Sequence, residues 1–208
     1  MYNMSLNKYL GGLNIEGHSQ QVPQQIHLLK QFCKIKRIKN IMEIGFNAGH
    51  SSEIFLEYNK DTNVVSFDIG SHDYVNKGKK FIDNKYPSRH TLIIGDSTKT
   101  VPAYIQQNKT KPFDLIYVDG GHTYDVARAD LMNCRHLSHK DTIVVMDDIV
   151  KKRRFDMNFI RPPHVLEPTR SWEECIQNNI IKQFGQINFS NTRGVAWGKY
   201  IKNVHSAI

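Results

Sequence analysis

Two kinds of apolar pattern alternate along the chain. Short apolar runs are separated by longer stretches in which apolar residues recur at helical spacing. The short runs predict strands at residues 40–44, 63–67, 91–94, 113–118, 142–146, 186–189 and 195–200. Strands that alternate with helices are typical of βα units, which build mainly parallel sheets.

The longer stretches predict helices at residues 23–36, 51–58, 75–84, 124–134 and 171–178. In the first of these, Ile26, Leu29, Phe32 and Cys33 form one apolar stripe, and Pro23 lies near the first turn, where proline is tolerated. We therefore predict an α/β fold with a doubly wound, mainly parallel, seven-stranded Rossmann-like sheet and helices on both faces. No repeat or linker divides the chain, so residues 23–208 would form one domain behind an N-terminal cap segment, residues 1–22.

Acidic residues follow the predicted strands at the point where each strand ends. Asp68, Asp96, Asp119 and Asp147 come at or just after the ends of four strands, and a glycine turn follows the first strand. In open α/β sheets, ligands bind at the carboxyl ends of the strands. We expect these residues to lie side by side and to form a binding site.

Composition narrows the class of protein. The 208 residues are 39% hydrophobic and 23% charged, which is an ordinary balance for a globular domain, and no run is long enough to cross a bilayer. The N-terminus lacks the apolar core of a signal peptide, and three scattered cysteines favour reduced thiols. We expect a cytoplasmic protein without a membrane partner, and a homo-oligomer is compatible with the sequence.

The turn after the first strand has a spacing that bears on the cofactor. Gly45 and Gly49 are spaced G-x-x-x-G, whereas dinucleotide-binding proteins have G-x-G-x-x-G. Asp68, at the end of the next strand, is placed to bond ribose hydroxyls, as in sites for either NAD or S-adenosylmethionine (SAM). SAM has no pyrophosphate, and its tail is a zwitterionic amino acid, so the acidic Glu43 beside the turn favours SAM. Glycines at such a turn can also have a purely steric role.

Two further strand ends carry recognisable motifs. They are Asp119-Gly120-Gly121-His122 after the fourth strand and Asp147-Asp148 after the fifth. With the glycine turn and Asp68, they resemble the class I SAM-dependent methyltransferases, of the branch with D-G-x-H and D-D at these strand ends. The resemblance covers residues 23–149 well and residues 169–172 more loosely.

This resemblance implies a set of cofactor-binding residues. Glu43, Gly45 and Gly49 would line the methionine part of SAM, Asp68 would bond the ribose, and Asp96 would bond the adenine amine next to Ser97. The whole implied set is Glu43, Gly45, Asn47, Gly49, Ser51, Asp68, Asp96, Ser97 and Asp119. For Asp96, a helix N-cap is the structural alternative.

Clustered carboxylates point to a cation. Asp119, Asp147 and Asp148 would repel one another, and three hard oxygen ligands suit Mg²⁺, Ca²⁺ or Mn²⁺. The chain is similar here to metal-dependent O-methyltransferases such as catechol O-methyltransferase, although Asp148 stands where those enzymes often have Asn. The alternatives are helix or turn capping for Asp147 and Asp148, and a cofactor contact for Asp119.

Asp119 and His122 are the candidate catalytic residues. A free histidine has a pKa of about 6.5, which suits proton abstraction near neutrality. His122 could therefore be a general base, a further metal ligand or a structural hydrogen-bonding residue. We expect His50 to be structural.

A basic run begins three residues after Asp148. Lys151, Arg153, Arg154 and Arg161 would bind an anionic group of a small-molecule acceptor, for example a nucleotide-linked sugar. We expect Pro162, Pro163 and His164 to form a loop that can move as a lid, and residues 1–22 to fold over the site.

Three functions follow from these patterns. The leading hypothesis is a metal-assisted O-methyltransferase for a small hydroxylated acceptor. A nucleic-acid methyltransferase or nucleic-acid-binding protein on the same scaffold is favoured by the net charge of +8, but the chain has no recognisable nucleic-acid-binding motif. An NAD-dependent oxidoreductase would need the dinucleotide glycine spacing, which is absent.

Overall fold

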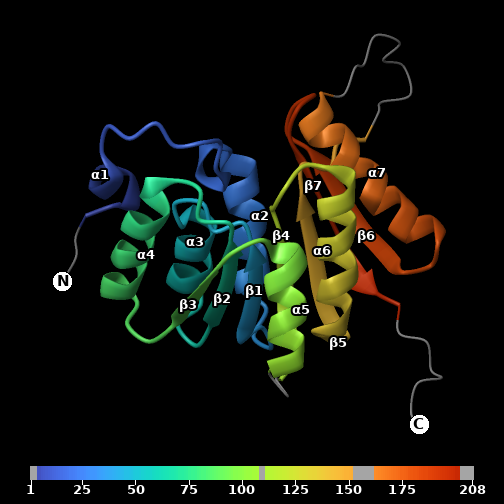
Figure 1. Ribbon diagram of the computed structural model, residues 1–208, viewed down its shortest axis with the longest axis horizontal. Coiled ribbons are helices and arrows are strands. Elements are labelled where there is room, and N and C mark those ends of the chain that lie inside the picture. Colours follow the sequence, from blue (N-terminus) through green and yellow to red (C-terminus); the bar gives the residue numbers. More distant parts are fainter. Residues whose placement is uncertain (1–3, 108–110, 152–161, 202–208) are drawn as a thin grey trace.

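A seven-stranded sheet forms the centre of the protein (Figure 1). The computed structural model describes residues 4–107, 111–151 and 162–201. The strand order is β3-β2-β1-β4-β5-β7-β6, the first five of these strands are parallel, and β7 is antiparallel to both neighbours. The strands are β1 (Asn40–Ile44), β2 (Asn63–Asp68), β3 (His90–Ile94), β4 (Phe113–Val118), β5 (Ser138–Asp147), β6 (Ile181–Asn188) and β7 (Gly194–Tyr200). The predicted fold is confirmed.

Helices cover both faces of the sheet because side chains alternate along each strand. Leu115 and Tyr117 of β4 belong to one apolar core and Ile116 and Val118 to the other. The first core packs under α1 (Leu6–Leu10), α2 (Pro23–Cys33), α3 (His50–Tyr58) and α4 (Asp73–Lys85). The second packs under α5 (Ser97–Gln107), α6 (Tyr124–His136) and α7 (Pro163–Gln177).

The strand register aligns the acidic strand ends. Ile44 of β1 pairs with Phe67 of β2 on one side and with Val118 of β4 on the other, and Val118 pairs with Met146 of β5. The residues that follow these positions are Gly45, Asp68, Asp119 and Asp147, which therefore lie at one level across the sheet. The predicted common rim is confirmed.

Several predicted boundaries were wrong. Helix α5 was missed because only Val101 of it is buried and Pro102 interrupts its pattern. Pro163 and His164 do not form a loop, because α7 begins at Pro163, which occupies a first-turn position where the missing N–H costs nothing, and Pro162 is the extended N-cap residue before it. Strand β6 begins at Ile181, earlier than predicted, because it is an edge strand with a mixed pattern of exposure.

All three cysteines are free and buried. Among the described residues, no helix has the length and apolar character needed to cross a membrane.

Candidate functional site

A cavity of about 780 Å³ lies at the carboxyl ends of the parallel strands. Residues at the ends of β1 to β5 line it, together with the N-terminal segment, the first turn of α7 and the β6–β7 turn. The predicted residues in its lining are Gly45, Asn47, Asp68, Asp96, Ser97, Asp119, His122 and Asp148. A cavity of this size accommodates a ligand as large as a nucleoside derivative.

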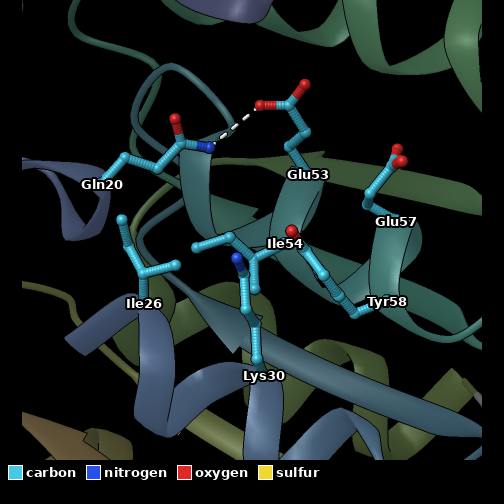
Figure 2. Close-up of a pocket in the computed structure, with 7 residues that line it drawn as sticks. All are labelled: Gln20, Ile26, Lys30, Glu53, Ile54, Glu57 and Tyr58. Carbon is cyan, nitrogen blue, oxygen red and sulfur yellow. Dashed lines mark hydrogen bonds between the residues drawn. The ribbon is translucent and has the colours of Figure 1, made fainter. Parts of the chain in front are cut away.

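A second hollow, of about 260 Å³, contains none of the predicted residues (Figure 2). It lies between α2 and α3, where Gln20 Nε2 donates a hydrogen bond to Glu53 Oε2 at 2.9 Å. It does not reach the strand ends, so the candidate site is the larger cavity.

The glycine turn brings the ends of β1, β2 and β4 into contact. Gly45 has a φ of 89°, and a Cβ on it would lie 1.8 Å from the carbonyl oxygen of Asp119. The N–H of Asn47 donates to Asp68 Oδ2 at 2.8 Å, and the N–H of Gly70 donates to Asp68 Oδ1 at 2.8 Å. These bonds hold the Asp68 carboxylate at the cavity wall, where its remaining lone pairs can accept from a ligand.

Glu43 lies behind the turn and does not line the cavity. It is fully buried and accepts hydrogen bonds from the hydroxyls of Ser51, Ser52 and Ser66, the last two at 2.5 and 2.6 Å. Burial raises the pKa of Glu43, and the three hydroxyls oppose that shift. Glu43 and Ser51 thus join β1 to α3 and support the glycine turn.

Gly49 also supports the turn from outside the cavity lining. It is the N-cap of α3, with a φ of 91°, and a Cβ there would lie 2.8 Å from the ring of Phe46. Only glycine fits this position without strain, because L-residues rarely adopt such a φ.

Asp96 caps a helix, which was the structural alternative, and its contact with adenine stays a prediction. It lines the cavity, and its Oδ1 accepts from the N–H and the hydroxyl of Thr98 at 3.0 and 2.7 Å, which caps the start of α5. These bonds lower the pKa of Asp96. Its Oδ2 lies 3.5 Å from the exposed Lys99 ammonium. Ser97, the first residue of α5, lines the cavity beside it.

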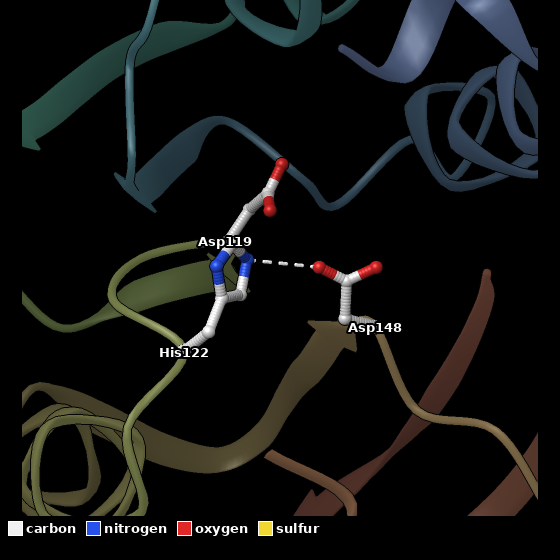
Figure 3. A group of neighbouring side chains, drawn as sticks. All are labelled: Asp119, His122 and Asp148. Atoms are coloured by element: carbon white, nitrogen blue, oxygen red, sulfur yellow. Dashed lines mark ion pairs between the residues drawn. The ribbon is translucent and has the colours of Figure 1, made fainter. Parts of the chain in front are cut away.

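Asp119, His122 and Asp148 form a compact group in the cavity wall (Figure 3). One potential ligand atom from each lies within 4.8 Å of the others, and His122 Nε2 is 2.9 Å from Asp148 Oδ2. This hydrogen bond raises the pKa of His122. Burial, followed by the nearby carboxylates of Asp147 and Asp148, raises the pKa of Asp119 well above its usual range.

Asp147, which the sequence analysis grouped with these carboxylates, is buried and does not line the cavity. Its Oδ2 accepts from Gln25 Nε2 at 2.6 Å and from the Tyr117 hydroxyl at 2.9 Å, and its Oδ1 accepts from the N–H of Asp148 at 3.0 Å. Burial raises its pKa to about 6. Asp148 has a φ of 58°, and the chain leaves the strand there, so that the Asp148 side chain points into the cavity.

Two residues at the site were missed by the sequence analysis. Gln25 is fully buried on the inner face of α2, and Arg193 lies in the cavity wall in the β6–β7 turn. No local pattern marks either residue, because a single Gln in an apolar stripe and a single Arg in a polar turn are ordinary.

Two residues of the predicted N-terminal cap segment lie at the cavity. Glu16 and Gly17 line it, Glu16 Oε1 is 3.3 Å from His72 Nε2, and the Gly17 carbonyl accepts from Asn47 Nδ2 at 3.3 Å. His18 stacks on His50 with ring centroids 3.6 Å apart, and burial lowers the pKa of His50 to about 3. His50 thus holds the segment in place as a neutral side chain.

The basic run lies largely outside the described residues, which do not include Arg153, Arg154 and Arg161. Lys151 is exposed and does not line the cavity, and its N–H donates to Asn188 Oδ1 at 3.1 Å. His164, by contrast, lines the cavity, and its ring centroid is 6.2 Å from that of His122.

Several solved structures with the same fold are methyltransferases. An O-methyltransferase from Bacillus cereus, solved with SAH, is 20% identical, has a TM-score of 0.68, and aligns over 85% of this chain and 80% of its own. TomG, an O-methyltransferase from Streptomyces achromogenes solved with SAM, is 17% identical, has a TM-score of 0.69, and aligns over 93% and 95%. The SAH-bound methyltransferase PaMTH1 from Podospora anserina is 16% identical, with a TM-score of 0.66 over 86% and 78%.

Sequence comparison places the chain in a family. A search of curated protein sequences gave no match. The profile of the methyltransferase domain family matches residues 42–149, which run from β1 to just past β5 and include the glycine turn, Asp68, Asp119 and Asp148. Because this match covers more than half of the chain, the protein belongs to the methyltransferase domain family.

Proposed function

We propose that this protein is a SAM-dependent O-methyltransferase that modifies a small hydroxylated acceptor with the help of a divalent cation. One observation carries the proposal: the group Asp119, His122 and Asp148 lies in the wall of the cavity that also contains Gly45 and Asp68. The proposed nucleoside site and the proposed cation site would therefore share one cavity.

The proposed cofactor, SAM, is supported by the side chains at the ends of the strands. The Asp68 carboxylate suits ribose hydroxyls, and Asp96 and Ser97 lie further along the same rim, where the adenine would bind. Asp119, next to the glycine turn, suits the ammonium of the amino-acid tail. SAH and SAM in the Bacillus cereus and Streptomyces achromogenes enzymes support the same cofactor here.

The proposed divalent cation is supported by the potential ligands Asp119, His122 and Asp148. Two carboxylates and an imidazole suit Mg²⁺ or Mn²⁺, and the imidazole favours Mn²⁺ more than an all-oxygen site would. Burial of like charges raises the pKa of Asp119, and a cation would relieve this repulsion. When bound, the cation would supply positive charge that lowers the pKa of a nearby hydroxyl.

The protein's own residues have to orient the acceptor and receive its proton. Transfer requires the acceptor oxygen to lie in line with the methyl group, which the cavity walls would enforce. His122 is half-exposed in the cavity, so it is placed to accept the hydroxyl proton if it does not ligate the cation. Asp147 positions the end of β5 through its bonds to Gln25 and Tyr117.

We also propose that the acceptor is anionic. The sequence basis for this is Arg153, Arg154 and Arg161, which follow β5, whereas Lys151 lies outside the cavity lining.

Labelled SAM and a panel of phenols and nucleotide sugars, with and without EDTA, test the function. We expect transfer to one acceptor class that EDTA abolishes and Mn²⁺ or Mg²⁺ restores. Transfer that persists in EDTA would reject the cation. Calorimetric titration with SAM, NAD and a short RNA separates the competing functions, and failure to bind SAM would reject the cofactor.

A further inference from the structure

The β6–β7 turn places a guanidinium group in the cavity wall. The carbonyl of Arg193 accepts from the N–H groups of Phe189 and Ser190 at 2.9 and 3.0 Å, and the next carbonyl, of Gly194, accepts from the N–H of Ile149 at 3.0 Å. A Cβ on Gly194 would lie 2.4 Å from the carbonyl oxygen of Ile149, so the turn packs directly on the chain that leaves β5. The position of Arg193 is therefore fixed relative to the site.

Arg193 has only neutral hydrogen-bond partners in the part of the chain that the structure describes. Its Nη1 donates to Gln21 Oε1 at 3.3 Å and its Nη2 to Gln25 Oε1 at 3.5 Å, both of which are long. The ion pairs found among the described residues do not include it. A half-buried guanidinium with amide partners alone keeps most of its capacity to bind an anion.

The nearby acids already have other partners. Asp147 accepts from Gln25, Tyr117 and the Asp148 N–H, and Asp148 is paired with His122. Asp119 lies within the candidate cation group. Arg193 lines the cavity and forms no contact ion pair among the described residues, although its positive charge is near enough to Asp119 and Asp147 to oppose the rise in their pKa values.

We propose that Arg193 is the carboxylate-binding residue of this cavity. A guanidinium presents paired N–H donors that match both oxygens of a carboxylate, whereas the other described side chains of the lining include no lysine or second arginine. The carboxylate that binds Arg193 could belong to either of two ligands: the amino-acid tail of SAM, or an acidic acceptor. The first source rests on the proposed cofactor and the second on the proposed acceptor.

Matched pairs of probes distinguish the sources by calorimetry. The first arm compares SAH with 5′-methylthioadenosine, which lacks the amino-acid tail. The second uses SAH-saturated protein with Mg²⁺ and compares 3,4-dihydroxybenzoate with its uncharged amide. In Arg193→Gln we expect one carboxylate probe to lose about tenfold or more in affinity, while its matched partner changes by less than about twofold.

A loss for SAH alone assigns Arg193 to the cofactor tail, and a loss for the benzoate alone assigns it to the acceptor. Equal losses within both pairs, or no loss in either, overturn the proposal. Arg37→Gln, an exposed site close to the amino end of β1, is the matched control and should leave all four affinities unchanged. Arg193→Lys keeps the charge without the paired donors and should lose less, which keeps the test decisive if the glutamine variant folds poorly.

Failure here is distinguishable from failure of the proposed function. The cation requirement is read from EDTA and Mn²⁺, which do not involve Arg193. SAH binding by wild-type protein tests the cofactor independently of any Arg193 variant.

Discussion

Gly45 lies against the carbonyl oxygen of Asp119, so closely that a Cβ on residue 45 would be 1.8 Å from that oxygen. The two residues directly follow the neighbouring strands β1 and β4, and the N–H of Asp119 donates to the Ile44 carbonyl at 2.8 Å. The glycine turn and Asp119 are thus packed together, and neither can shift without the other.

Gly45→Ala should therefore damage stability and ligand binding together. The backbone clash and the φ of 89° both have to be relieved, and we expect the free energy of unfolding to fall by about 3 kcal/mol or more. Chemical denaturation and SAH titration measure the two effects. Gly12→Ala is the control: its φ is 76° but its Cβ would meet nothing within 4 Å, so only strain of about 1 kcal/mol is expected. Equal effects of the two substitutions would contradict this account of the turn.

Gln25→Ala should destabilise the protein, because Gln25 of α2 holds the buried ends of β4 and β5 through hydrogen bonds. It removes the Nε2 donor shared by Asp147 and Tyr117 in a fully buried position, so the free energy of unfolding should fall by about 1–3 kcal/mol. Gln24→Ala, one residue earlier and exposed on the same helix, should have little effect in the same denaturation experiment. If both variants unfold alike, the buried hydrogen bonds do not stabilise the site.

Asp130 should make stability depend on pH. Burial raises its pKa to about 7, so the folded protein holds a proton there that the unfolded chain, with an ordinary aspartate pKa of about 4, has lost. The contribution of Asp130 to stability is therefore greatest below pH 4 and falls as pH rises to 7, by up to about 1.4 kcal/mol per pH unit. Asp130→Asn should reduce this slope relative to wild type, whereas Asp125→Asn, exposed on the same helix, should retain it. Denaturation midpoints at several pH values give the comparison, and an unchanged slope in Asp130→Asn would reject it.

Asp148→Asn should weaken cation binding without unfolding the protein. The amide is close to the carboxylate in shape but removes one charge from the group with Asp119 and His122, so we expect the affinity for Mn²⁺ to fall about tenfold or more. Electron paramagnetic resonance of free Mn²⁺ gives the dissociation constant directly. Asp141→Asn, exposed near the other end of β5, is the matched control. Similar constants for wild type and Asp148→Asn would remove Asp148 from the ligand set.

The sequence predicted the part of the site that follows from strand order. Once β1, β2, β4 and β5 are parallel neighbours, the residues after each strand must share one edge, which is why Asp68, Asp119 and Asp148 could be grouped before any coordinates. Helix α5 and the start of α7 were harder to predict from the sequence, because prolines and a weak apolar stripe obscure their periodicity.

Alternation and turn chemistry along the chain thus determined the sheet, its two helical layers and the acidic rim. Only the tertiary structure decided the direction of each side chain at that rim. Asp148 points into the cavity because its φ is positive, whereas Asp147 is buried and accepts a hydrogen bond from Gln25. Glu43 lies behind the glycine turn, where it accepts hydrogen bonds from three serine hydroxyls. The tertiary structure also brought Arg193 to the cavity from a strand pair nearly 150 residues beyond Gly45. These contacts join residues far apart in sequence, and a local pattern carries no information about which distant partner a buried polar group will meet.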